Sequence, residues 1–203
     1  MFTVRPDDEQ ILLPELQTQA FHCTRAQLLF LSPQARPTMR ILVSFLTKRK
    51  RSPDEDDWKK LKQVLQYLKG TMHMQLLITV DRLSTIQCHV DNSDGVHYNY
   101  KGHTGMTMTL GAGAAMSMSK AYTLNTGSST ESELVGMYDA LPDILWGRYF
   151  FEAQGHVIDH NILLRDNKST ILLATNGMMS SSKKTKHIRN GFFLIKDRLS
   201  WGM

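Results

Sequence analysis

Hydrophobic and polar residues follow two different periods along the chain, and the change falls near residue 80. Before it, apolar side chains recur every three or four residues, which is typical of helices packed on one side. The clearest stripe consists of Trp58, Leu61, Val64, Leu65 and Leu68. We expect Ser52 to cap this helix, Pro53 to occupy its first position and Gly70 to end it. Shorter helices are expected at 27–31 and 41–46.

From residue 84 the apolar positions alternate with polar ones, as they do in half-buried strands. We expect strands at 84–91, 104–110, 114–119 and about 160–166. The short glycine-containing loop between the second and third strands predicts a hairpin. Helices are expected at about 130–154, after Asn167 and at about 183–199. Pro142 should kink or split the first of these. This order predicts an α/β domain with a mixed sheet.

The two periods and the ends of the chain suggest three zones. They are an irregular lead segment at 1–20, a helical segment at 21–80 and the α/β domain at 84–203. No apolar run is long enough to cross a membrane, and the first residues lack the pattern of a signal peptide. Cys23 and Cys88 match no zinc or disulfide pattern, so we expect reduced, buried thiols in an intracellular protein of the cytoplasm or nucleus.

Composition and charge fit a globular protein that could bind a polyanion. Hydrophobic residues make up 41% of the chain and charged residues 21%, while the net charge is +5. The positive charge gathers in two runs, at 48–51 and 183–189. A solvated charged face explains such a run as readily as a nucleic-acid contact does, so both interpretations stay open.

Three carboxylates stand where the predicted elements begin or end. Asp91 ends the first strand, Glu133 lies in the first turn of the long helix, and Asp166 ends the fourth strand. If those two strands are neighbours, the three side chains meet at one edge of the sheet. Crowded carboxylates repel one another, and a structure that tolerates them usually holds a cation. Oxygen ligands suit Mg²⁺ or Mn²⁺, and two such ions can promote hydrolysis of a phosphodiester.

Each of these residues also has a purely structural explanation. Glu133 could complete a capping box with Thr130, Asp91 could form a turn, and Asp166 could help to cap the next helix. Glu131 competes with Glu133 for the position on the helix, as does Asp139, and spacing alone does not choose between the two glutamates.

Residues 84–199 resemble the ribonuclease H domain of copia-like retrotransposon polyproteins. The strings that carry the resemblance are His89-Val90-Asp91, Lys101-Gly102-His103-Thr104-Gly105, Ser128-Ser129-Thr130-Glu131-Ser132-Glu133-Leu134-Val135, Arg165-Asp166-Asn167-Lys168-Ser169-Thr170-Ile171 and Lys184-Thr185-Lys186-His187-Ile188. Upstream, three strings within 27–71 resemble the segment that links reverse transcriptase to ribonuclease H in the same elements. A ribonuclease H-like mixed sheet with flanking helices is the fold that this resemblance implies.

The resemblance also implies an activity and its residues. Asp91, Glu133 and Asp166 would be the catalytic and metal-binding residues, with Glu133 preferred to Glu131 because it precedes the aliphatic residue of the string. Two Mg²⁺ or Mn²⁺ ions would serve hydrolysis of the RNA strand of an RNA–DNA hybrid during reverse transcription. The upstream partner would be the palm and fingers of reverse transcriptase. The residues expected to contact the hybrid are Asn167, Lys183, Lys184, Lys186, His187 and Arg189.

One departure from the family pattern bears on this activity. The family places a fourth carboxylate in an Ala-Asp-Ile-Leu-Thr-Lys type of string, within a helix that follows a fifth strand. No such string occurs before Ser200-Trp201-Gly202-Met203. We therefore expect the last strand and helix of the domain to be missing. The alternative function is a truncated, non-catalytic remnant that acts as a weak nucleic-acid-binding or structural module.

Overall fold

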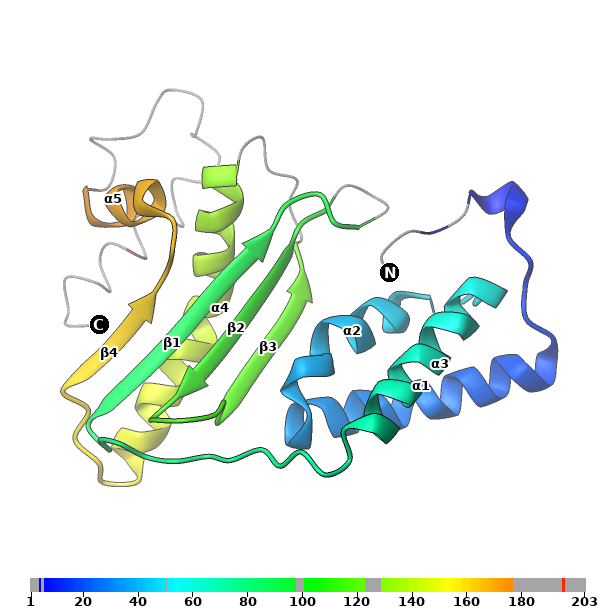
Figure 1. Cartoon of the computed structure of the whole chain (residues 1–203). Helices are drawn as coiled ribbons and strands as arrows, with labels where there is room; N and C mark the ends of the chain where they lie inside the picture. The colour runs from blue at the N-terminus through cyan, green and yellow to red at the C-terminus, as the bar shows by residue number, and fades with distance from the viewer. Residues whose placement is uncertain are drawn as a thin grey trace. The chain divides into compact units, whose positions relative to one another are not determined.

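The structure is a computed structural model that describes residues 4, 6–49, 51–97, 101–122, 129–176 and 195. The chain divides into two compact units, Met1–Leu77 and Ile78–Met203. The first unit contains helices and the second contains a sheet with helices, as Figure 1 shows by colour from the N-terminus onward. Each unit is described by itself.

The first unit is built from the helices α1 (Glu15–Ala35), α2 (Arg40–Lys48) and α3 (Glu55–Gly70), with the short 3₁₀ turns η1 (Asp7–Glu9) and η2 (Pro37–Met39). Their apolar sides enclose a core that includes Phe21, Leu28, Val43, Leu46, Leu61 and Val64. α1 begins within the segment that we expected to be irregular and runs through Pro33. It ends before Pro37, whose ring disfavours the helical conformation in the preceding residue, Arg36.

The cap of α3 corrects the prediction that Ser52 fills this role. Asp54 is the N-cap, because its carboxylate accepts a hydrogen bond from the backbone N–H of Asp57 at 2.8 Å. The carboxylate of Asp57 accepts one from the backbone N–H of Asp54 at 3.2 Å in return. Arg49 donates to Asp57 through Nε at 2.8 Å. This cation at the end of α2 favours the acidic cap over the neutral serine.

In the described part of the second unit, four strands form one mixed sheet in the order β3-β2-β1-β4. They are β1 (Thr85–Ser93), β2 (His103–Thr109), β3 (Met116–Ala121) and β4 (His160–Leu164). β2 is antiparallel to both β1 and β3, and β4 is parallel to β1. The predicted hairpin and the predicted α/β class with a mixed sheet and flanking helices are therefore confirmed. The arrangement is compatible with a ribonuclease H-like fold.

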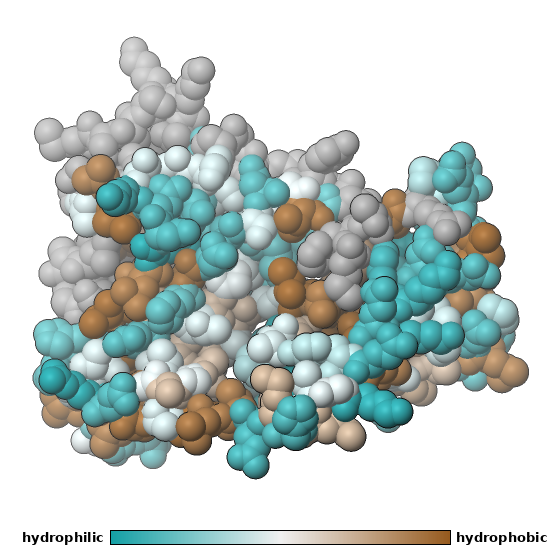
Figure 2. Space-filling model, in the orientation of Figure 1, coloured by the Kyte–Doolittle hydropathy of each residue, from teal (hydrophilic) through white to brown (hydrophobic). Residues whose placement is uncertain are grey.

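One face of this sheet is covered by α4 (Ser129–Ala153), as Figure 1 shows. Ile86, Cys88 and Val90 of β1 point to that side and are buried with Ala140 and Ile144 of the helix. The other face carries the exposed residues of β1 and β4, and Figure 2 shows hydrophobic and hydrophilic residues side by side on it.

α4 is continuous, so the prediction that Pro142 could split it is wrong. Leu141 and Ile144 are buried on either side of the proline, and this packing holds the helix together where one backbone hydrogen bond is lost. α5 (Lys168–Asn176) follows β4, where a helix was predicted after Asn167. The helix predicted at 183–199 lies outside the described residues, except Ile195, which is helical and buried.

The two cysteines differ in their surroundings. Cys88 is buried in the sheet, as predicted, whereas Cys23 is exposed on α1, which corrects the expectation of a buried thiol. The residues of α1 that enter the core, Phe21 and Leu28, lie on a different side of the helix. Among the helices that the structure describes, none combines the length and the apolar composition that crossing a membrane requires.

Candidate metal centre

The parallel pairing of β1 with β4 brings two of the three predicted carboxylates to one edge of the sheet. Asp91 lies near the end of β1, and Asp166 follows the end of β4. Glu133 reaches the same place from the beginning of α4, which packs against β1. One oxygen from each carboxylate can be chosen so that all three lie within 4.8 Å of one another. The first and fourth strands are neighbours, which is the condition under which the sequence predicted that the three carboxylates would meet, and they lie together.

Burial separates the roles of these carboxylates. Asp91 and Asp166 are exposed, whereas Glu133 is buried beneath them. Thr130 lies inside α4, which begins at Ser129, so it is not the N-cap of a capping box with Glu133. The carboxylate of Glu133 is instead engaged by Arg165 and Asn92, two residues that the sequence did not identify as part of a site.

Arg165 places a cation among the carboxylates. Its side chain is only 1% exposed, and Nη2 forms an ion pair with Oε2 of Glu133. Nη1 donates to the backbone carbonyl of Val90 at 2.8 Å. Burial lowers the pKa of Arg165, while the nearby charges of Asp91 and Asp166 act in the opposite direction. An arginine keeps its proton under such conditions, so the centre contains a permanent positive charge.

Asn92 joins the end of β1 to α4. Its Nδ2 donates to the carbonyl of Glu133 at 3.1 Å and lies 3.4 Å from Oε2 of the same residue. Its backbone N–H donates to Oδ1 of Asp91 at 2.8 Å. The approach is possible because residue 136 is glycine, since a Cβ there would lie 2.0 Å from Oδ1 of Asn92. Asn92 and Gly136 thus hold Asp91 and Glu133 close together.

Tyr122 fixes the beginning of α4 from the side of β3. Its hydroxyl lies 2.6 Å from Oγ of Ser132 and donates to the carbonyl of the same residue at 3.0 Å. The ring is buried, and burial raises the pKa of its hydroxyl. This contact restrains the helical turn that carries Glu133.

The other predicted residues lie elsewhere or have other contacts. The carboxylate of Asp139 lies 3.9 Å from Nζ of Lys120, and burial raises its pKa while Lys120 opposes the shift. Oδ1 of Asn167 accepts hydrogen bonds from the backbone N–H groups of Ser169 and Thr170 at 3.0 and 3.2 Å, so Asn167 caps α5, the role considered for Asp166. Lys183, Lys184, Lys186, His187 and Arg189 lie outside the described residues.

The donor set fits a hard divalent cation. Three carboxylates supply only oxygen ligands, which Mg²⁺ and Mn²⁺ prefer, and two of them face solvent, from which water can complete the coordination. Oε2 of the third carboxylate, Glu133, already forms an ion pair with Arg165. The residues could therefore hold an ion mainly through Asp91 and Asp166.

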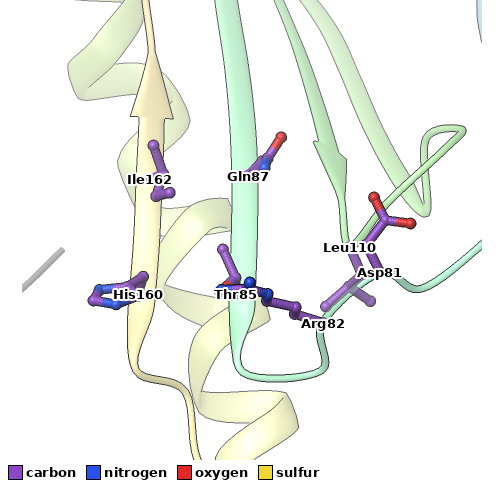
Figure 3. A pocket seen from close by; sticks show the side chains of 7 residues that line it. All are labelled: Asp81, Arg82, Thr85, Gln87, Leu110, His160 and Ile162. Carbon is purple, nitrogen blue, oxygen red and sulfur yellow. The ribbon is translucent and has the colours of Figure 1, made fainter.

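A pocket of about 350 Å³ lies at the opposite end of β1 and β4. Its walls come from Asp81, Arg82, Thr85, Gln87, Leu110, His160 and Ile162, which Figure 3 shows around the first residues of the two strands. It is separated from the carboxylates by the length of β1, and none of the predicted site residues lines it.

Two curated plant proteins are similar to most of the chain. The retrovirus-related Pol polyprotein from transposon TNT 1-94 of Nicotiana tabacum is 25% identical over 163 residues, which cover 80% of this chain and 12% of the relative. The retrovirus-related Pol polyprotein from transposon RE2 of Arabidopsis thaliana is 24% identical over 169 residues, which cover 82% of this chain and 12% of the relative. No protein-family model and no solved structure matches. The chain thus spans 12% of the length of these relatives, and the similarity supports an origin in a retroelement Pol polyprotein.

Proposed function

We propose that the chain carries a ribonuclease H-type site, which hydrolyses the RNA strand of an RNA–DNA hybrid with the help of Mg²⁺ or Mn²⁺. The observation that supports this most strongly is the convergence of Asp91, Glu133 and Asp166, whose oxygens lie within 4.8 Å of one another. Similarity to Pol polyproteins adds a context in which such hybrids are formed. Residues 21–80 would then correspond to the segment after the palm and fingers of reverse transcriptase.

The chain's own residues would divide the work at this site. Asp91 and Asp166 would bind the metal, because both are exposed at the same edge of the sheet. A bound divalent ion would supply an activated water and neutralise charge on the phosphate. Arg165 and Asn92 would hold Glu133 in place, because both contact its Oε2. Fixed positions matter because small displacements of such groups reduce rates strongly.

The hybrid would be held through its phosphates and 2′-hydroxyls, without readout of base sequence. Asn167 uses its side-chain oxygen as an acceptor to cap α5, and a hydrogen bond to a phosphate would come from its Nδ2. Lys183, Lys184, Lys186, His187 and Arg189 remain proposed contacts with the same backbone. Their contribution should weaken as the salt concentration rises.

The test is cleavage of a labelled RNA–DNA hybrid by the purified chain with Mg²⁺ or Mn²⁺. We expect cleavage by the wild type and a rate at least about 100-fold lower for Asp91→Asn, because a direct metal ligand is lost. Asp159→Asn is the matched control, since Asp159 is an exposed aspartate just before β4 and outside the carboxylate cluster. Equal cleavage by the wild type and Asp91→Asn would exclude the proposed nuclease.

The ion pair between Arg165 and Glu133 supports a second candidate function. Because a cation from the protein already neutralises the buried carboxylate, the fold does not require a metal ion to tolerate it. The chain would then be a non-catalytic remnant with weak affinity for nucleic acid. Binding of a fluorescent hybrid that is equal with and without Mg²⁺, together with no cleavage, would identify this function.

A further inference from the structure

We infer that Arg165 limits the acidic cluster to one divalent metal ion. The inference rests on the proposed function only in assuming that Asp91 and Asp166 bind metal. It goes beyond that function because it assigns a role to a residue that is not itself a metal ligand, and because it departs from the two ions that the family resemblance implies.

The position of the guanidinium is fixed from two sides. Nη1 donates to the carbonyl of Val90 on β1, and Nη2 pairs with Oε2 of Glu133 on α4. The side chain is 1% exposed, so it is enclosed at the base of the cluster and does not extend along the surface. Nε and Nη2 are buried and have no hydrogen-bond partner among the described residues, so Nη2 is compensated by its ion pair alone. The carboxylates around it are therefore the main compensation for burying its charge.

The charges leave room for one divalent ion. Asp91, Glu133 and Asp166 carry three negative charges, and Arg165 carries one positive charge. Two negative charges remain, which one divalent ion neutralises. A second ion would raise the net charge to +2 with Arg165 present, against +1 without it, around oxygens that lie within 4.8 Å of one another. Like charges at that separation, partly shielded from water, repel strongly.

The carboxylate oxygens that could bind metal also favour a single divalent ion. Two ions in one site usually share a carboxylate that bridges them or have several carboxylates each. Here Oε2 of Glu133 is engaged by Arg165, and Oδ1 of Asp91 accepts the backbone N–H of Asn92 at 2.8 Å. The exposed carboxylates of Asp91 and Asp166 are sufficient, with water, for a single ion that keeps part of its hydration shell.

The number of bound ions can be counted directly with Mn²⁺, whose free form gives an electron paramagnetic resonance signal that is lost on binding. We expect one Mn²⁺ per wild-type chain. Arg165→Met removes the charge and keeps an unbranched side chain, so it should bind two Mn²⁺, the first about 10–100-fold more tightly than the wild type does. Arg165→Lys keeps the charge and should still bind one.

Arg148→Met is the matched control, because Arg148 pairs with Glu152 on α4 at 2.8 Å and takes no part in the cluster. It should bind one Mn²⁺ with unchanged affinity. Two ions on the wild type, or none, would overturn the inference, as would a single ion on Arg165→Met with a native circular dichroism spectrum. If Arg165→Met does not fold, the counts for the wild type and Arg165→Lys decide.

The nuclease proposal can fail separately. A wild-type chain that binds one Mn²⁺ and does not cleave the hybrid would retain the inference and exclude the nuclease. A chain that cleaves the hybrid with two bound Mn²⁺ would support the nuclease and overturn the inference.

Discussion

Replacing Gly136 by alanine tests how Asn92 connects the sheet to α4. A Cβ at position 136 would lie 2.0 Å from Oδ1 and 2.2 Å from Nδ2 of Asn92, so the asparagine must rotate away. It would then lose its hydrogen bonds to the carbonyls of Ser132 and Glu133, at 3.4 and 3.1 Å. The substitution therefore acts on the contact that holds Asp91 beside Glu133.

The expected change is the difference between two effects. Two lost hydrogen bonds reduce the free energy of unfolding by about 1–3 kcal/mol. Alanine is favoured over glycine inside a helix by about 1 kcal/mol. Gly136→Ala should therefore destabilise the second unit by up to about 2 kcal/mol. In an Asn92→Ala background the obstacle is gone, and the same substitution should stabilise the unit by about 1 kcal/mol.

A double-mutant cycle with urea denaturation measures both values. Tryptophan fluorescence can follow unfolding in a Trp58→Phe background, which removes the tryptophan of α3 in the first unit. The coupling between positions 92 and 136 should be about 1–3 kcal/mol. If alanine at position 136 changes the stability equally in both backgrounds, Asn92 does not lie against α4, and the reasoning about this contact is wrong.

Further predictions concern the cap of α3, the buried thiol and the contact at Tyr122. Arg49→Met should destabilise the first unit by about 3 kcal/mol in thermal unfolding, because it removes the ion pairs of Arg49 with the buried carboxylates of Asp54 and Asp57 and leaves Asp57 only the longer pair with Lys60, at 3.7 Å. Burial raises the pKa of Asp57 above its usual 3.8, so the folded state binds this proton more tightly than the unfolded chain does. Stability should therefore fall as the pH rises from 3.8 through the raised pKa, and Asp57→Asn should abolish this effect in urea titrations. Burial raises the pKa of Cys88 to about 12, so a thiol reagent should label Cys23 alone in the native chain and both cysteines after denaturation. Labelling of Cys88 in the native chain would contradict its burial. Tyr122→Phe should reduce stability by about 1 kcal/mol in urea unfolding, since it removes the hydrogen bonds to Ser132.

Alternation of side chains predicted the strands well because it records burial directly. β1 was expected at 84–91 and spans Thr85–Ser93, with Ile86, Cys88 and Val90 facing α4 as the alternation indicated. The beginning of α1 was missed because Glu15–Ala20 shows no apolar period, although these residues continue a helix whose later turns enter the core. The cap of α3 was misplaced because serine and aspartate are both good caps, and the ion pair with Arg49 is a tertiary contact.

The difference between local patterns, which the sequence shows, and tertiary contacts, which it does not, applies to the site as well. The positions of Asp91, Glu133 and Asp166 relative to predicted strand ends and a helix start were sufficient to predict that they could meet. Arg165, which follows β4, and Asn92, on β1, both act through contacts with Glu133 on α4. These contacts join elements far apart in the sequence, so the roles of the two residues could not be predicted. Arg165 stands next to Asp166 in the sequence, and a cation beside a predicted metal ligand was the one signal that pointed to it.

The parallel pairing of β1 with β4 has a consequence for the order in which the chain folds. β1, β2 and β3 are joined by antiparallel pairing and can assemble as soon as they have been synthesised. β4 reaches β1 only after the whole of α4 has crossed the sheet, and parallel pairing of this kind is slow. Asp166 and Arg165 arrive with β4, so the last carboxylate of the cluster and the cation that partly neutralises the cluster are introduced in the same step. A nascent chain that ends before them exposes Asp91 on a partial sheet and has no centre at which a metal could be captured.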